Sequence, residues 1–246
     1  MRVVERSDAG KSRVLRLLDE LEASAAVRRT EYLTSGSVTE PGGAAASPKS
    51  ARLAELVESV GESETGMAVF WGDEVATVVL PPFPIGEPMS EEGVCTAPLV
   101  GLLKADFLVA VVLLRLGHYG VGVLRGDSLV ASKSGSRYVK SRHRAGGSSQ
   151  RRFERSRERL VRELFDKCCE TAVGVLAPFR DGIGYVLMGG EKHTLREFRE
   201  RCGLMRELSD RTLARTLKVD RPGKKALEGI GHQVWKSTVV VLDLVG

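Results

Sequence analysis

Three short β-rich runs follow one another between residues 107 and 132. They are Phe107–Leu116, Tyr119–Arg125 and Ser128–Ser132, and only Gly117-His118 and Gly126-Asp127 separate them. Connections this short join antiparallel neighbours, so the segment predicts a three-stranded meander. The first run is apolar at consecutive positions and therefore on both faces, which predicts that it lies in the centre of a sheet.

A long amphipathic helix is predicted from about Gln150 to Leu176, with Pro178 closing it. The apolar residues at helical spacing, which should face the core, are Phe153, Leu160, Val161, Leu164, Phe165, Cys168, Ala172 and Val173. Beyond the helix we expect a strand (Gly184–Met188), a helix capped by Thr194 and stopped at Gly203, a strand (Thr216–Val219), a helix (Pro222–Trp235) and a strand (Thr238–Leu244). This order predicts an α/β fold on a mixed sheet, of the ribonuclease H-like kind, in one compact body from Met67 to Leu244.

The chain before the meander is predicted to form two segments. Residues 1–60 should form an N-terminal helical extension of two helices joined by a Gly/Ala/Pro linker at 35–47. Residues 61–105 should form a lead-in, with a hairpin of Met67–Trp71 and Val75–Leu80 and a short helix at Pro98–Lys104. The catalytic domain is then expected at residues 106–246.

Positive charge is concentrated in one segment. The whole chain carries +5, from 37 Lys and Arg against 32 Asp and Glu, whereas residues 133–159 alone hold ten basic and two acidic residues. One basic segment on a mildly acidic body indicates a local phosphate contact, because a nucleic-acid coat would spread its charge. The alternative is a solvated basic helix.

Several classes of function are disfavoured. Residues 1–14 carry charges throughout, and the apolar run Phe107–Leu114 is too short for a membrane span, so we expect a cytoplasmic protein. The first predicted strand lacks the carboxylates of a two-metal nuclease, and Gly10-Lys11-Ser12 lacks the first glycine of a phosphate-binding loop. We expect no metal and no cofactor. The four cysteines form no CxxC pair and are expected to be reduced thiols, namely Cys95, Cys168, Cys169 and Cys202.

The candidate site is the segment that precedes the long helix. Gly146-Gly147-Ser148-Ser149 should form an exposed loop with arginines on both sides, and Lys133 to Gln150 should be poorly ordered without a partner. Gln150 offers a carboxamide and no group that titrates near neutrality. Such a site must position water and stabilise an oxyanion, which suits the ester of peptidyl-tRNA. The alternative is a flexible basic loop with an incidental glutamine.

The same residues resemble the middle domain of the class 1 release factors of eukaryotes and archaea. Gly135 to Arg144, Gly147-Ser-Ser-Gln150 and Arg151-Arg-Phe-Glu-Arg are more similar still to Vms-type peptidyl-tRNA hydrolases, over about residues 66–244. Two serines separate the glycine pair from Gln150, unlike the contiguous Gly-Gly-Gln of release factors. The resemblance implies catalytic roles for Gly147, Ser148, Ser149 and Gln150, and RNA contacts by Arg137, Lys140, Arg142, Arg144, Arg151, Arg152 and Arg155.

The resemblance also implies a function. Gln150 would coordinate the attacking water or the tetrahedral intermediate, Gly147 would let the loop enter the peptidyl transferase centre, and Arg142 and Arg144 would bind the CCA end. With no stop-codon-reading domain, we expect a monomeric, codon-independent hydrolase of peptidyl-tRNA on the large ribosomal subunit, acting in ribosome rescue. Two alternatives stay open: an endonuclease for the tRNA 3′-CCA end, and a ribosome-binding or tRNA-binding factor without catalysis.

Overall fold

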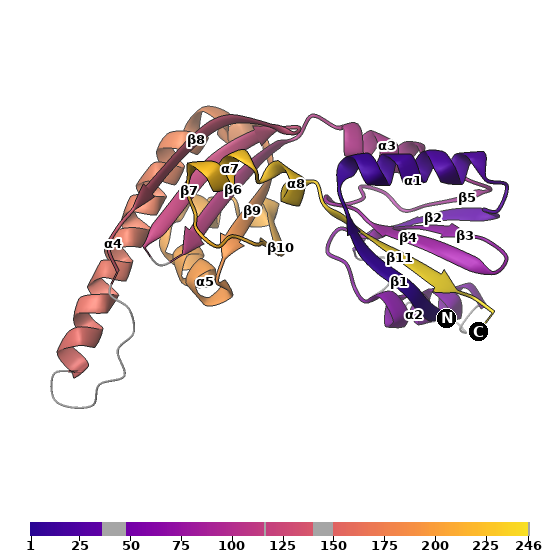
Figure 1. The fold of residues 1–246 in the computed structure, drawn as a ribbon, viewed down its shortest axis with the longest axis horizontal. Coiled ribbons are helices and arrows are strands. Elements are labelled where there is room, and N and C mark those ends of the chain that lie inside the picture. The colour runs from indigo at the N-terminus through magenta and orange to yellow at the C-terminus, as the bar shows by residue number, and fades with distance from the viewer. Residues whose placement is uncertain (36–47, 116, 140–149, 246) are drawn as a thin grey trace. The chain divides into compact units, whose positions relative to one another are not determined.

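The computed structural model describes residues 1–35, 48–115, 117–139 and 150–245. The chain divides into two compact units, Met1–Ala105 with Trp235–Gly246, and Asp106–Val234. Each unit is built on its own sheet (Figure 1). The prediction of a single body from Met67 to Leu244 is therefore wrong, although the predicted α/β class and a mixed sheet are present.

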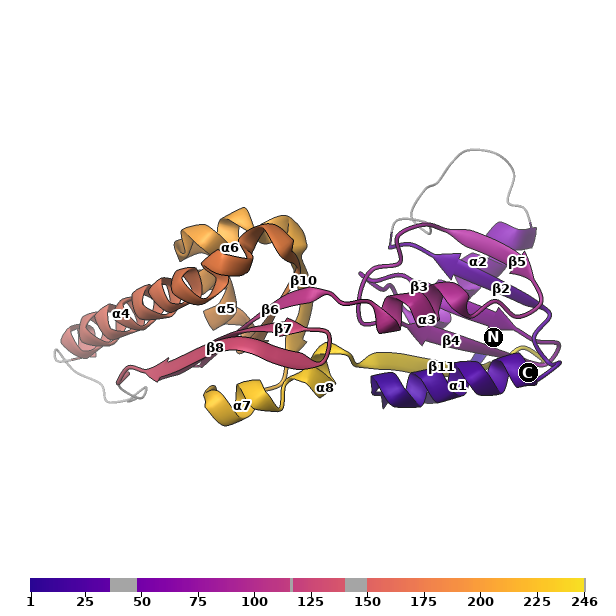
Figure 2. The same cartoon turned by 90° about the horizontal axis from the view of Figure 1, so that it is seen from above.

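The first unit is a six-stranded antiparallel sheet in the order β1-β11-β4-β3-β2-β5. Its strands are β1 (Arg2–Ala9), β2 (Arg29–Leu33), β3 (Met67–Trp71), β4 (Val75–Leu80), β5 (Met89–Glu92) and β11 (Ser237–Asp243). Helices α1 (Lys11–Ala23) and α3 (Ala97–Lys104) cover one face, and α2 (Pro48–Val60) covers the other (Figure 2).

The predicted N-terminal helical extension is wrong, because β1 and β2 lie within the first 60 residues. β1 is an edge strand paired only with β11, and its charged side chains stay exposed, so it lacks the apolar alternation that marks a strand. β11 was expected to complete the catalytic domain, but it pairs with β1 and β4 in the first unit. The β3–β4 hairpin and α3 confirm their predictions.

The second unit has a five-stranded mixed sheet in the order β10-β9-β6-β7-β8. Its strands are β6 (Leu108–Arg115), β7 (His118–Arg125), β8 (Ser128–Ser136), β9 (Ile183–Gly190) and β10 (Thr212–Leu217). The meander is confirmed, and β6 is the central strand, antiparallel to β7 and parallel to β9. Its helices are α4 (Gln150–Leu176), α5 (Lys192–Arg201), α6 (Gly203–Glu207), α7 (Lys224–Glu228) and α8 (Gly231–Val234), with 3-10 turns η1 (Ala177–Gly182) and η2 (Ser209–Arg211).

Two helix predictions in this unit need correction. α5 begins after Glu191, and Thr194 is buried inside the helix, so Thr194 is no cap. The helix expected from Pro222 to Trp235 is two short ones, α7 and α8, because the chain turns at Gly229.

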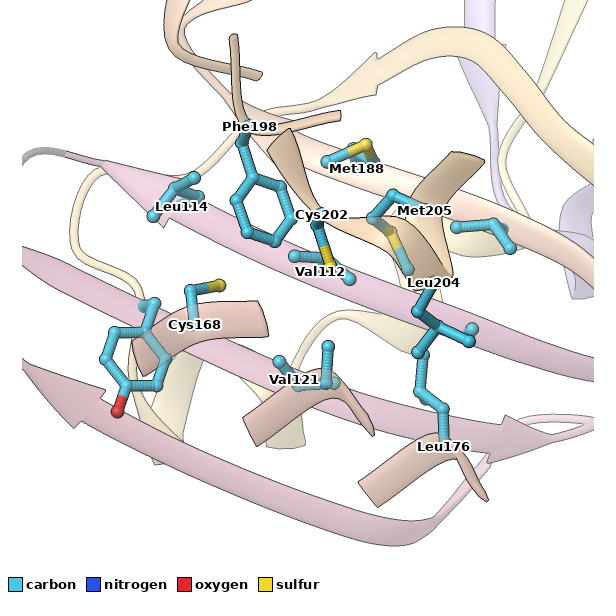
Figure 3. Close-up of a cluster of buried hydrophobic side chains, with 14 of the residues drawn as sticks. Val112, Leu114, Val121, Cys168, Leu176, Met188, Phe198, Cys202, Leu204 and Met205 are labelled. Carbon is cyan, nitrogen blue, oxygen red and sulfur yellow. The ribbon is translucent and has the colours of Figure 1, made fainter. Parts of the chain in front are cut away.

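One face of the second sheet is covered by α4, α5 and α6. Val112 and Val121 of the sheet pack in one buried cluster with Cys168 of α4, Phe198 of α5 and Met205 of α6 (Figure 3). α7 lies against β7 and β8, where a Cβ at Gly120 would come within 3.1 Å of the Leu227 side chain. Within the described ranges, no helix combines the length and the apolar character that crossing a membrane demands.

Candidate nucleic-acid interface

The two units carry opposite charge. The first holds 11 Lys and Arg against 17 Asp and Glu, and the second holds 26 against 15. The basic character of the chain therefore belongs to the second unit. A polyanion would be attracted to this unit and repelled by the first.

Helix α4 carries the candidate site at its N-terminal end. The helix has 27 residues, so it is about 40 Å long. Its first fully buried side chain is Leu164, and Val161 packs against the same core, so roughly the first 15 Å of the helix lie beyond the core. Figure 1 shows this end of α4 running past the sheet. The reason lies in the sequence, because Arg and Glu dominate the helix up to Arg159.

The arginines of α4 differ in how they are paired. Arg159 lies 4.0 Å from Glu163, and Arg162 lies 3.7 Å from Glu158. Arg152 and Arg155 are exposed, and neither forms an ion pair with another residue that the structure describes. These two guanidinium groups can therefore bind an external anion without losing a carboxylate.

The strand that leads to the site is tied to α4 by Arg137. Its backbone N–H donates to the Gly117 carbonyl at 3.0 Å, and its guanidinium contacts the Glu163 carboxylate at 2.8 and 3.3 Å. Arg137, a predicted RNA contact, thus has an intramolecular partner. Lys133 to Ser136 belong to β8, so the expected disorder is wrong for that stretch.

Two exposed aromatic residues lie on the elements that flank the predicted loop. Tyr138, just after β8, is 74% exposed, and Phe153, in the first turn of α4, is 58% exposed. Phe153 was expected to face the core, as was Val173, but both are exposed. Aromatic rings on a basic surface can stack on unpaired bases. The sequence pattern did not mark Tyr138, because an isolated residue after a strand has no periodicity.

The remaining predicted site residues lie at the start of α4 and in the segment before it. Gln150 and Arg151 are the first two residues of α4, and only their backbone is described. The predicted residues that lie outside the described ranges are Lys140, Arg142, Arg144, Gly147, Ser148 and Ser149.

The groups of the second unit whose pKa values are shifted lie away from the start of α4. A hydrogen bond from Arg201 lowers the pKa of Asp166, and burial raises the pKa values of the Cys168 thiol and of Tyr185. Across the described ranges, no group of three or more His, Cys, Asp or Glu side chains is arranged to hold a metal ion. What the described part of the interface offers is positive charge, aromatic surface and a helix N-terminus.

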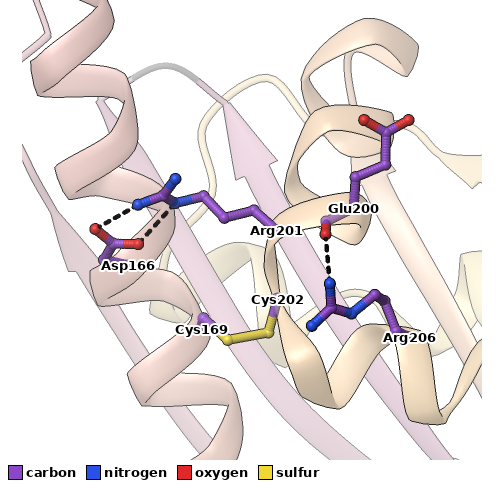
Figure 4. The surroundings of a disulfide bond; sticks show 6 residues. All are labelled: Asp166, Cys169, Glu200, Arg201, Cys202 and Arg206. Carbon is purple, nitrogen blue, oxygen red and sulfur yellow. Dashed lines mark hydrogen bonds and ion pairs between the residues drawn. A yellow bond between two sulfur atoms is a disulfide. The ribbon is translucent and has the colours of Figure 1, made fainter.

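The core end of α4 is fixed covalently. A disulfide joins Cys169 of α4 to Cys202 at the α5–α6 junction, with the two Cα atoms 5.6 Å apart (Figure 4). Beside it, Arg201 donates to Asp166 at 2.7 and 3.1 Å. The prediction of four reduced thiols is therefore wrong for this pair. Cys95 and Cys168 are free thiols.

Curated relatives are archaeal release factors. "Peptide chain release factor subunit 1" of Archaeoglobus fulgidus is 34% identical over 116 residues, which are 47% of this chain and 28% of that protein. The protein of the same name from Thermococcus sibiricus is 29% identical over 163 residues, 61% of this chain and 39% of that one. The matches thus span well under half the length of these relatives.

Solved structures give a weaker likeness. The archaeal translation termination factor aRF1 matches with 19% identity and a TM-score of 0.40, over 92% of this chain and 73% of that one. The Vms1 mitochondrial localization core matches with 9% identity and a TM-score of 0.44, over 89% of each chain.

The family model described as "Actinobacteria/chloroflexi VLRF1 release factor" matches residues 108–240. This range runs from the central strand β6, through α4 and its basic end, into β11. Since the match takes in more than half of the sequence, the chain belongs to the VLRF1 release factor family.

Proposed function

We propose that this protein is a codon-independent peptidyl-tRNA hydrolase that releases nascent peptides on stalled or split large ribosomal subunits in the cytoplasm. The observation that carries the proposal is the position of Gln150. It is the first residue of α4, at the tip of the basic part of the helix that extends beyond the core. The chain also belongs to a release factor family. Residues 106–234 would be the catalytic domain, a variant of the ribonuclease H-like arrangement.

Membership of a release factor family implies contact with the ribosome and tRNA. We infer that the second unit makes this contact, because its charge is positive and the first unit's is negative. Arg152 and Arg155 would bind phosphates near the acceptor end, together with Lys140, Arg142, Arg144 and Arg151. Arg137 would serve chiefly to hold the end of β8 against α4, since Glu163 already neutralises it.

The chemistry is ester hydrolysis without an acid–base pair in the protein. A water oxygen attacks the ester carbonyl, the carbonyl oxygen becomes an oxyanion, and the intermediate collapses with departure of the 3′ oxygen of the terminal ribose. The proton lost by the water ends on that 3′ oxygen. Gln150 would orient the water with its carboxamide, and its backbone N–H, one of the unpaired donors that begin α4, would stabilise the oxyanion.

The proposal is tested on large subunits that carry peptidyl-tRNA, with no mRNA present. The expected products are free peptide and tRNA with an intact CCA end. Peptide attached to a clipped CCA fragment would instead identify a tRNA 3′-end endonuclease. If binding occurs and neither bond is cut, the protein is a non-catalytic binding factor.

Removing the two unpaired arginines tests whether α4 contacts RNA phosphates. For Arg152→Ala/Arg155→Ala, we expect weaker binding to large subunits and a salt slope, in log–log form, that is shallower by roughly 1.4 to 1.8, because each lost phosphate contact contributes about 0.7 to 0.9. The measurement is the affinity at several salt concentrations. The matched control is Arg180→Ala, since Arg180 is paired with Glu207 in the same unit. An unchanged slope in the double variant would mean that these arginines only solvate the helix.

A further inference from the structure

A polar cavity lies in the first unit, outside the candidate site on α4. It has a volume of about 580 Å³ and lies on the face of the sheet that α2 covers. Arg29 and Glu31 are two residues apart on β2, so their side chains lie on the same face of the sheet. Trp71 is the register partner of Arg29 on β3. Arg52 enters from α2, and Arg28 and Asp73 form the rim.

The charges in this cavity are not balanced. Arg28 is neutralised by Asp73, which accepts its hydrogen bonds at 2.7 to 3.1 Å. Arg29 lies 3.8 Å from Glu31. Arg52 forms no ion pair with any residue in the described ranges, and its guanidinium stacks on the Trp71 ring at 4.1 Å from the centroid. Among the described residues that line the cavity, three guanidinium groups thus face two carboxylates, within a unit that is acidic overall.

The side chains at the buried end of the cavity are held in place by hydrogen bonds. The Glu31 side chain is only 6% exposed, accepts from Trp71 Nε1 at 2.9 Å and contacts Ser90 Oγ at 3.4 Å. These contacts hold Trp71, and Trp71 in turn holds Arg52. A guanidinium that is already oriented loses less freedom when it binds a ligand. Its planar N–H groups match two oxygens of a phosphate.

We propose that this cavity binds the phosphate group of a nucleotide, either free or at the end of an RNA. The volume is that of a small-molecule site and exceeds what a single inorganic anion would fill. Arg52 and Arg29 would hold the phosphate, while Arg28 and Asp73 would border the nucleoside. The site does not use Gln150 or the second unit, so it can be tested without the ribosome.

The test is calorimetric titration of the full chain with a nucleoside 5′-monophosphate, the matching nucleoside, inorganic phosphate, and short RNAs with and without a 5′-phosphate. We expect the monophosphate to bind and the nucleoside not to bind. A bound monophosphate with no difference between the two RNAs identifies a free nucleotide as ligand, and a preference for the phosphorylated RNA identifies an RNA end. If no phosphate compound binds, or if the nucleoside binds as well as the monophosphate, the proposal is wrong.

Two variants with opposite expected effects on affinity show whether the ligand binds in this cavity. Arg52→Ala should weaken binding roughly 10- to 100-fold, the range for hydrogen bonds to a charged group. Glu31→Gln keeps an acceptor for Trp71 and removes a negative charge, so it should tighten binding by about three- to tenfold. The control is Arg16→Ala, an exposed arginine on α1 at the opposite face of the sheet. Equal affinity of Arg52→Ala and the unaltered protein would overturn the assignment. Peptide release is measured separately, so failure of the proposed hydrolase leaves this result unaffected.

Discussion

Replacing Gln150 by alanine should slow peptide release by about 10²-fold and leave the affinity for large subunits almost unchanged. The magnitude is that of removing one oxyanion or water-orienting donor. Binding should persist because the phosphate contacts come from arginines and the charge of the second unit is unaltered. A residual rate is expected, since the backbone N–H of residue 150 remains in the variant.

The measurement pairs two quantities on the same complexes, namely the affinity for large subunits with peptidyl-tRNA and the single-turnover rate of release. The chain offers a matched control, because its two glutamines are Gln150 and Gln233. Gln233 bonds the backbone N–H and C=O of Lys218 at 2.8 and 2.9 Å, a structural role, so Gln233→Ala should release peptide normally while folded. Full activity of Gln150→Ala would remove Gln150 from the mechanism, and parallel loss of binding and release would favour the binding-only alternative.

Elements encoded by neighbouring residues were predictable. The β6–β8 meander follows from two short glycine-containing turns, and α4 from a helical pattern that begins at Gln150 and ends near Pro178. The candidate site was predicted in the same way, from glycine, serine, arginine and glutamine within one segment. Family resemblance then supplied a role for Gln150 that spacing alone does not contain.

Features that depend on distant parts of the chain were missed. β1 pairs with β11, so Arg2 pairs with Asp243 although the two residues lie near opposite ends of the sequence. No local sequence pattern indicates such a pair. Exposure of Phe153 was missed for a related reason. The apolar spacing of α4 continues to that residue, but the core that it would enter ends near Leu164. Periodicity describes a face of a helix and not how much of that face is covered.

The disulfide could not be predicted from the spacing of neighbouring cysteines. Cys168 and Cys169 project in directions about 100° apart on a helix, so they cannot pair with each other. Cys168 points into the core, and Cys169 meets Cys202, which is 33 residues away and is brought close by the packing of α5 and α6 on α4. A helix contact of this kind has no signal in spacing.

Breaking the Cys169–Cys202 bond should lower the free energy of unfolding of the second unit by about 4 kcal/mol. The bond closes a loop of 33 residues and thereby lowers the conformational entropy of the unfolded chain. Breaking it restores that entropy, which stabilises the unfolded state by this amount. For a unit of this size the change corresponds to a drop in Tm of roughly 10 to 15 °C.

Thermal unfolding of Cys169→Ala/Cys202→Ala and of the unaltered protein measures the difference, with Cys95→Ala as control because Cys95 is a free thiol in the other unit. Counting thiols in unfolded, unreduced protein should give two, Cys95 and Cys168, and four after reduction. Four reactive thiols before reduction would show that the bond is absent. Below the lowered Tm, release should be unaffected, because the Asp166–Arg201 ion pair and the buried side chains of α4 still hold the helix on the sheet. A large loss of release in the folded double variant would instead mean that the position of Gln150 depends on the covalent link about 30 Å away along α4.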